Sequence, residues 1–175
     1  IKGDYPRALK KSMQALAVLE KTGDRLRLSD CMNNIAIMHM LKGENEKSLE
    51  FHGKSLRIRK ENNDQKRVAV SLHNIGLVYE RQGDFDNALD YHLQAIKIEN
   101  KLGSEFSIAR SLNHIGIVYS KMNEPGKALE YFKRSLALKK KIGDTSGIAS
   151  STQAIGITYM DLKDYRNSLR FLVEA

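Results

Sequence analysis

A forty-residue repeat runs through this chain of 175 residues and constrains its fold more than any other feature. The stretch SLHNIGLVYERQGDFDNALDYH, which begins at Ser71, returns as SLNHIGIVYSKMNEPGKALEYF from Ser111. The register has no insertion or deletion, and one of its positions is always isoleucine: Ile35, Ile75, Ile115 and Ile155. A single globular core gives no reason for such a repeat, whereas stacked units do. The sequence therefore predicts a solenoid of similar units.

Each repeat carries the apolar spacing of two helices. Ile75, Val78 and Tyr79 recur at the interval of one helical stripe, and Leu89 and Ile96 belong to a second stripe later in the unit. The chain has only two prolines and is rich in good helix formers. We therefore predict an all-α fold in which every unit is a pair of antiparallel helices.

Residues that favour turns and helix ends separate the predicted helices. Within a pair, Gly43 and Gly83 stand where a left-handed residue ends a helix, Asn123 replaces them in the third unit, and Lys163 in the last. Because lysine tolerates that conformation less well, we expect a looser turn at Lys163. Between pairs, good N-cap residues precede the next helix: Asp24, Asp64, Ser104 and Asp144.

The register divides the chain into one array. We expect the second helix of a partial repeat over 1–23, full repeats over 24–63, 64–103 and 104–143, and a truncated repeat over 144–175. The chain begins at Ile1 rather than methionine and ends in mid-pattern. We therefore expect a fragment of a longer protein.

Composition narrows the classes of function. Hydrophobic residues make up 41% and charged residues 29%, which is typical of a globular protein. No run of 18 apolar residues predicts a membrane span. The one cysteine, Cys31, cannot form an internal disulfide, so we expect a reducing compartment, the cytoplasm. A formal net charge of +8 suggests either nucleic acid or an acidic protein partner.

The most basic run, YFKRSLALKKK from Tyr131 to Lys141, lies on a predicted second helix. Nucleic acid needs a continuous basic surface with positioned contacts, so a solvated helix face is the better interpretation. We therefore expect no direct nucleic-acid binding.

No chemical motif stands out from the repeat. His73 and His114 lie on adjacent first helices and could approach each other, but two imidazoles without a cysteine or a placed carboxylate make a weak zinc site. His39, His52 and His92 occupy core-edge positions of the repeat. Because no nucleophile, base and orienting group combine, we expect no enzyme activity, no metal and no cofactor.

HNIGLVYERQGDFDNALDYHLQAI resembles the tetratricopeptide repeat (TPR): an Ile-Gly pair, a tyrosine, a Gly-Asp turn and two later alanines. The resemblance covers the whole chain, although the usual unit has about 34 residues and lacks this longer helix pair. The longer form is similar to the repeats of animal polarity adaptors that bind GoLoco-containing partners, and to arrays in bacterial signalling proteins. The resemblance implies a right-handed superhelix whose first helices line a concave groove that binds a peptide or helical segment of a partner.

We expect the groove to use first-helix positions that packing does not need. Amides and imidazoles that could bind a peptide backbone are Asn33, Asn34, His73, Asn74, Asn113, His114 and Gln153. Aliphatic residues that could form an apolar floor are Ile37, Leu77, Ile117 and Ile157. Basic residues that could select an acidic or amphipathic partner are Lys66, Arg81, Arg110 and Lys121. The alternatives are that the amides bond to neighbouring helices or water, that the aliphatic side chains belong to the core, and that the charges are solvated.

Three functions are compatible with this pattern. The first is a protein-interaction scaffold. The second is the regulatory input region of a larger signalling protein, such as a histidine kinase, a cyclase or a transcription regulator. The third is self-association as a homodimer through the N-terminal helix, whose apolar stripe is expected to lack a partner helix: Leu9, Met13, Leu16 and Leu19.

Overall fold

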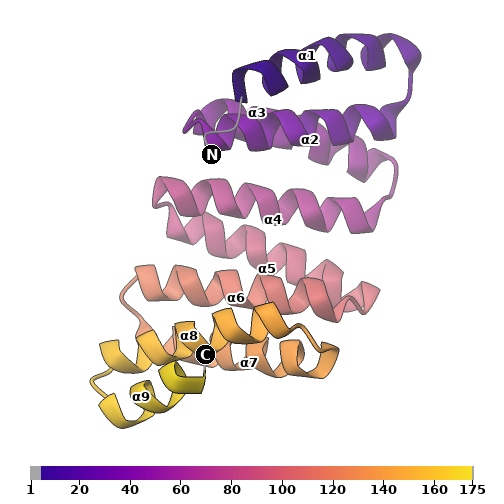
Figure 1. Cartoon of the computed structure of the whole chain (residues 1–175). Coiled ribbons are helices and arrows are strands. Elements are labelled where there is room, and N and C mark those ends of the chain that lie inside the picture. The colour runs from indigo at the N-terminus through magenta and orange to yellow at the C-terminus, as the bar shows by residue number, and fades with distance from the viewer. Residues whose placement is uncertain (1–4, 175) are drawn as a thin grey trace. The chain divides into compact units, whose positions relative to one another are not determined.

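The computed structural model describes residues 5–174, and the side chains from residue 7 onward. The described part consists of nine α-helices joined by short turns, and no strand occurs in it (Figure 1). The helices are α1 (Tyr5–Thr22), α2 (Arg25–Leu41), α3 (Asn45–Glu61), α4 (Gln65–Gln82), α5 (Phe85–Leu102), α6 (Glu105–Lys121), α7 (Pro125–Ile142), α8 (Thr145–Asp161) and α9 (Tyr165–Glu174). The predicted all-α fold of antiparallel helix pairs is confirmed.

The chain divides into two compact units, Ile1–Tyr91 and His92–Ala175, with the boundary inside α5. In the first unit, α2 packs against α1, α3 and α4. In the second unit, α7 packs against α6 and α8, and α8 also packs against α9. No described helix is long and apolar enough to cross a membrane.

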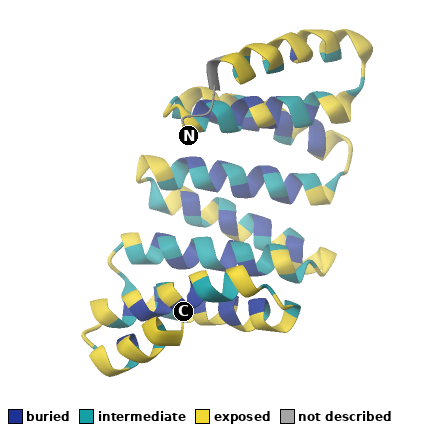
Figure 2. Ribbon diagram, in the orientation of Figure 1, coloured by how far each residue is buried: buried dark blue, intermediate teal, exposed yellow. Residues whose placement is uncertain are grey.

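The isoleucine of the repeat lies in the core of both units. Ile35 packs with Leu16, Met32 and Ile58 in the first unit, and Ile155 packs against α7 in the second. Buried positions lie along the middle helices, whereas α1 and α9 are mostly exposed (Figure 2).

The expectation of an uncovered stripe on the N-terminal helix is wrong in part. α1 packs against α2, which buries Leu16 and half-buries Leu9 and Leu19. Met13 alone of the four predicted residues is exposed, at 44%. Of the four residues proposed for dimerisation, Leu16 therefore belongs to the core of the first unit, whereas Leu9 and Met13 line an open hollow of about 610 Å³ beside α1.

The turns within the helix pairs fall at all four predicted residues. Gly43, Gly83 and Asn123 all adopt positive φ, and so does Lys163 at 58°. The amide of Asp164 donates to the carbonyl of Tyr159 at 2.9 Å, the same bond that closes the other turns. The prediction of a looser turn at Lys163 is therefore wrong, because these backbone bonds hold lysine in the left-handed conformation.

Three of the four predicted N-caps bond as expected. The carboxylates of Asp24, Asp64 and Asp144 accept from the backbone amide three residues later, at 2.9–3.1 Å. Ser104 holds the same place but its hydroxyl bonds to the hydroxyl of Ser107 at 2.9 Å instead. The helix starts are thus set by local sequence, as the capping rule predicts.

Candidate functional site

The predicted binding residues all lie on the first helices of the two units, although some of them are buried. We call the surface of α2 and α4 the first-helix face of the first unit, and that of α6 and α8 the first-helix face of the second unit. The first face carries Asn33, Asn34, Ile37, Lys66, His73, Asn74, Leu77 and Arg81. The second face carries Arg110, Asn113, His114, Ile117, Lys121, Gln153 and Ile157. Each set comes from two helices one repeat apart, which is why the repeat aligns them.

The amides of the first unit divide into two roles. Asn74 Nδ2 donates to Asn33 Oδ1 at 3.0 Å, which joins α4 to α2. Asn33 and His73 are buried, whereas Asn34 is exposed. Asn34 also lines a hollow of about 400 Å³ beside α1 and α2. Of these amides, Asn34 is therefore the exposed one, while Asn33 and Asn74 hold two helices together.

Cys31 lines the same hollow and is half-buried. Burial raises the pKa of its thiol, and Sγ donates to the backbone carbonyl of Ser12 at 3.3 Å. A raised pKa disfavours the reactive thiolate. Cys31 stands where the later repeats carry Ser71, Ser111 and Ser151, and this geometry is that of a packing residue.

A chain of four charges crosses the face of the first unit. Arg59, from α3, reaches between α2 and α4, where Nη2 lies 2.8 Å from Asp30 Oδ1 and Nη1 donates to Ser71 Oγ at 2.7 Å. Arg67 lies 3.2 Å from the same carboxylate oxygen and 2.6 Å from Asp64. Arg59 is only 3% exposed, so Asp30 supplies the charge that such a buried cation requires.

A second buried cation occupies the corresponding place in the second unit. Lys139, from α7, is 7% exposed, and its Nζ donates to Ser151 Oγ at 2.7 Å and to Asn113 Oδ1 at 3.5 Å. Burial lowers the pKa of Lys139, and the charge of Asp144 opposes that shift. Asn113 therefore belongs to an internal network as well as to the predicted face.

The aliphatic positions split between core and surface. Ile117 packs against the core of the second unit, as the alternative interpretation predicted. Ile37 and Leu77 are half-buried, and Ile157 is 44% exposed. The basic side chains of Lys66, Arg81 and Lys121 are exposed. Ile157 is therefore the most exposed member of this set.

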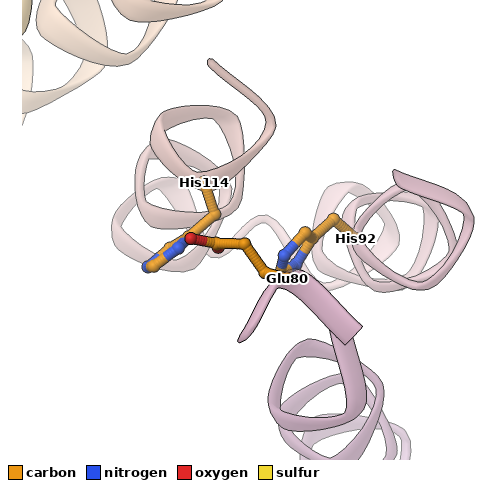
Figure 3. A group of neighbouring side chains, drawn as sticks. All are labelled: Glu80, His92 and His114. Atoms are coloured by element: carbon orange, nitrogen blue, oxygen red, sulfur yellow. The ribbon is translucent and has the colours of Figure 1, made fainter. Parts of the chain in front are cut away.

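His114 pairs with an imidazole of its own unit. Its ring stacks on that of His92, with centroids 5.6 Å apart and planes 27° from parallel (Figure 3). Glu80, also labelled there, belongs to the first unit. No further described His, Cys, Asp or Glu of the second unit joins the two rings as a possible ligand. A structural zinc site takes four ligands, of which this ring pair can supply two at most.

The sequence interpretation missed the buried charges of the second helices. Arg59, Glu99 and Lys139 occupy one position of the repeat, and all three are buried. Burial raises the pKa of Glu99, and the Ser111 hydroxyl and the Arg110 charge oppose that rise. A signal was present: the same position of the first repeat is Leu19, which marks it as facing inward.

The second helices otherwise match the prediction for a solvated surface. Lys133, Arg134, Lys140 and Lys141 are all exposed. Lys141 pairs with Glu105, and Lys133 lies 5.2 Å from the centre of the Tyr159 ring. Lys133, Arg134 and Lys141 thus have local partners on the protein.

The fold, in which pairs of antiparallel helices repeat along the chain, defines a helical-repeat protein of the α–α superhelix class. Two family models described as tetratricopeptide repeat match residues 67–141 and 28–63, together more than half of the chain. The chain belongs to the tetratricopeptide repeat family. No curated protein matches it in sequence.

Solved structures share this fold at low sequence identity. BtubC (BKLC) from P. vanneervenii is 20% identical with a TM-score of 0.88, over 99% of this chain and 72% of that one. Aspartyl phosphate phosphatase F from Bacillus subtilis is 15% identical with a TM-score of 0.88, over 94% of this chain and 43% of that one. A Rap protein complexed with competence and sporulation factor is 15% identical with a TM-score of 0.83, over 96% and 47%. At these identities, the likeness concerns the fold.

Proposed function

We propose that the protein is an interaction scaffold that binds a peptide or helical segment of a partner on its first-helix faces. The observation that carries this proposal is the exposure of side chains that packing does not use. Asn34 stands beside the hollow of the first unit, and Gln153 and Ile157 project from α8 of the second. The role is binding rather than catalysis, in the cytoplasm, as expected from the family and the single cysteine.

The chemistry of the faces favours an acidic or amphipathic segment. Lys66 and Arg81 on the first face, and Arg110 and Lys121 on the second, supply positive charge. Exposed ion pairs each contribute only about 0.2–1 kcal/mol. Apolar contact with Ile157 and its half-buried equivalents therefore supplies most of the affinity, and the charges provide selection. Micromolar binding, about −8 kcal/mol, is a reasonable magnitude for such a face.

The test is a peptide-display selection against the protein, followed by calorimetry on variants. We expect the selected peptides to be acidic or amphipathic, and the double variant Arg110→Glu with Lys121→Glu to bind them more than tenfold more weakly at unchanged helicity. The control carries the same charge change on second-helix surface, as Lys133→Glu with Lys140→Glu. Equal affinity of the two double variants would contradict the electrostatic part of the proposal.

A photo-crosslinking residue tests the location independently of charge. Placed at Gln153, it should capture a bound peptide, and placed at Lys140 on α7 it should not. Capture at Lys140 alone would indicate that the second helices carry the binding surface and would contradict the proposed function.

A regulatory role within a longer protein is the second candidate. It is favoured by the coverage of the solved structures, since this chain matches 43% of aspartyl phosphate phosphatase F and 47% of the Rap protein. The sequence of the full-length gene product tests it. A kinase, cyclase or DNA-binding segment next to the array would support this candidate, and an array alone would contradict it.

A further inference from the structure

The second unit joins two imidazoles at a pair of repeat positions where the other repeats have at most one. The first position lies on a second helix, and the other lies on the first helix that follows it. Across the repeats, the residues at these two positions are Ser12 with Asn34, His52 with Asn74, His92 with His114, and Phe132 with Ala154. The fold therefore does not require an imidazole at either position, because other residues occupy both of them in equivalent helices.

Side chains at these two positions are directed at a common place. In the first unit, Ser12 and Asn34 together line the hollow of about 400 Å³ beside α1 and α2. In the second unit, the rings of His92 and His114 have their centroids 5.6 Å apart, with planes 27° from parallel (Figure 3). A nitrogen of one ring lies within 4.8 Å of a nitrogen of the other. The pair thus brings two nitrogen donors to one place.

The separation of these nitrogens is close to what one metal ion needs. Two nitrogens bound at about 2.0–2.1 Å to a tetrahedral ion lie about 3.4 Å apart, and about 4.2 Å is the limit in any geometry. From the upper separation of 4.8 Å, the pair needs to close by about 0.6–1.4 Å. The terminal torsion of histidine is broad, and rotation about it moves a ring nitrogen by about an ångström. Side-chain rotation alone therefore suffices.

Burial gives the two rings different roles. His92 is fully buried, so the packing of the second unit holds its ring in place. His114 is half-buried, so one side of the pair is open to solvent. An ion can therefore enter past His114 and meet a second donor that is already positioned.

The donor set determines which ions the pair can hold. No cysteine and no further described carboxylate of the second unit joins the two rings as a possible ligand. Arg110 precedes His114 by one helical turn, and its charge acts on the buried carboxyl of Glu99. Imidazole is a preferred ligand of Cu²⁺, Ni²⁺ and Zn²⁺, whereas Mg²⁺ and Ca²⁺ take oxygen ligands. Two neutral nitrogens therefore favour a late transition-metal ion over a hard cation.

We propose that His92 and His114 chelate one divalent late transition-metal ion, with water in its remaining coordination positions. Two protein ligands make an exchangeable site rather than the closed four-ligand site of a structural zinc. The usual order of affinities places Cu²⁺ above Zn²⁺ at such a pair. This inference does not rest on the proposed function, because peptide binding on the first-helix faces requires no metal.

The experiment titrates Zn²⁺ into the native chain and follows the ring protons of its five histidines by NMR. We expect the signals of His92 and His114 to shift together and to saturate at one ion per chain, while those of His39 and His52 stay in place. Mg²⁺ at the same concentration should shift none of them, and Cu²⁺ should displace Zn²⁺. A shift of one ring alone, or no shift of either at millimolar Zn²⁺, would overturn the proposal.

Two variants remove one donor each and insert a residue that the repeat already uses at that position. His92→Phe inserts the residue found as Phe132, and His114→Asn the residue found as Asn74. We expect both to fold and to bind Zn²⁺ at least tenfold more weakly than the native chain. His52→Leu is the control and should bind as the native chain does. Native affinity in either of the first two variants overturns the site, and if His92→Phe unfolds, His114→Asn decides alone.

Thermal unfolding gives a second readout of the same site. An ion that binds the folded chain raises its Tm. Saturating Zn²⁺ should therefore raise the Tm of the native chain and of His52→Leu, and leave that of His114→Asn unchanged. An equal rise in His114→Asn would assign the effect to other groups and contradict the proposal.

Discussion

His52, a fully buried histidine of the first unit, makes stability depend on pH. His52, on α3, is fully buried, and neither ring nitrogen has a hydrogen-bond partner among the described residues. Burial lowers its pKa from 6.5 to about 4, and the charge of Arg59 contributes. The unfolded chain therefore binds a proton at higher pH than the folded chain does. The contribution of neutral His52 to the free energy of unfolding is therefore complete above pH 6.5 and is lost as the pH falls toward 4.

We predict that His52→Leu removes this dependence. Leucine already occupies the corresponding position of the last pair, as Leu172. A pKa difference from 6.5 to about 4 corresponds to about 3 kcal/mol of unfolding free energy between these pH values. Urea unfolding at a series of pH values should show this loss in the native chain and a flatter profile in the variant. Parallel profiles from pH 6.5 to 4 would contradict the assignment to His52.

A carboxylate, Glu44, gives a separate loss of stability at lower pH. Hydrogen bonds from Lys42 and His39 lower the pKa of Glu44 from 4.5 to about 2. Stability from this group is lost as the pH falls from 4.5 toward 2, a window that overlaps that of His52 only between about pH 4.5 and 4. Both proteins should show this second loss, so it serves as an internal reference.

At the scale of elements, each hairpin combines a ring pair with a small residue. Rings from the first and second helix stack at 5.4–5.6 Å in all four pairs: His39 with Phe51, Tyr79 with Tyr91, Tyr119 with Tyr131, and Tyr159 with Phe171. In the second unit, Gly116 faces Phe132 and Gly156 faces Leu172. The absence of a Cβ is what allows these helices to approach each other.

We predict that Gly116→Ala destabilises the second unit. A Cβ there would lie 2.7 Å from the Phe132 ring, so the ring or the helix must move, at a cost of about 1–3 kcal/mol. Gly53→Ala is the matched control, because Gly53 also lies inside a helix but has nothing within 4 Å of its Cβ position. The control should gain about 0.5–1 kcal/mol from helix propensity. Thermal unfolding measures both, and a stabilised Gly116→Ala would refute the packing role.

For the whole molecule, the net charge of +8 affects how fast an acidic partner arrives rather than how long it stays. Exposed charges act through solvent, and the Debye length falls from about 30 Å at 0.01 M salt to about 3 Å at 1 M. Contacts made by buried groups such as Lys139 are screened less.

We therefore predict that salt lowers the association rate of an acidic peptide much more than it raises the dissociation rate. Stopped-flow fluorescence with a labelled peptide measures both rates across this range of salt. If dissociation instead accounted for most of the change in affinity, exposed ion pairs would hold the complex and the buried groups would contribute little.

Much of the fold followed from the sequence, because repeats, helices, turns and caps depend on neighbours within a few positions. The spacing of Ile35, Ile75, Ile115 and Ile155 predicted which face of each first helix is buried, and Asp24, Asp64 and Asp144 predicted three helix starts. The candidate site was predicted less completely. Asn34 and Ile157 were placed on an exposed face, whereas Asn33 and Ile117 proved to serve packing.

Only the tertiary structure showed where the long side chains of the second helices end. Arg59 donates a hydrogen bond to Asp30, which lies 29 residues away in the sequence, and Lys139 donates one to Asn113, which lies 26 residues away. Periodicity states which way a side chain leaves its helix, but a charged group several bonds further out is placed by the packing of the helices around it. The sequence by itself determined a stack of helix pairs, and the tertiary packing decided which charges in that stack are neutralised.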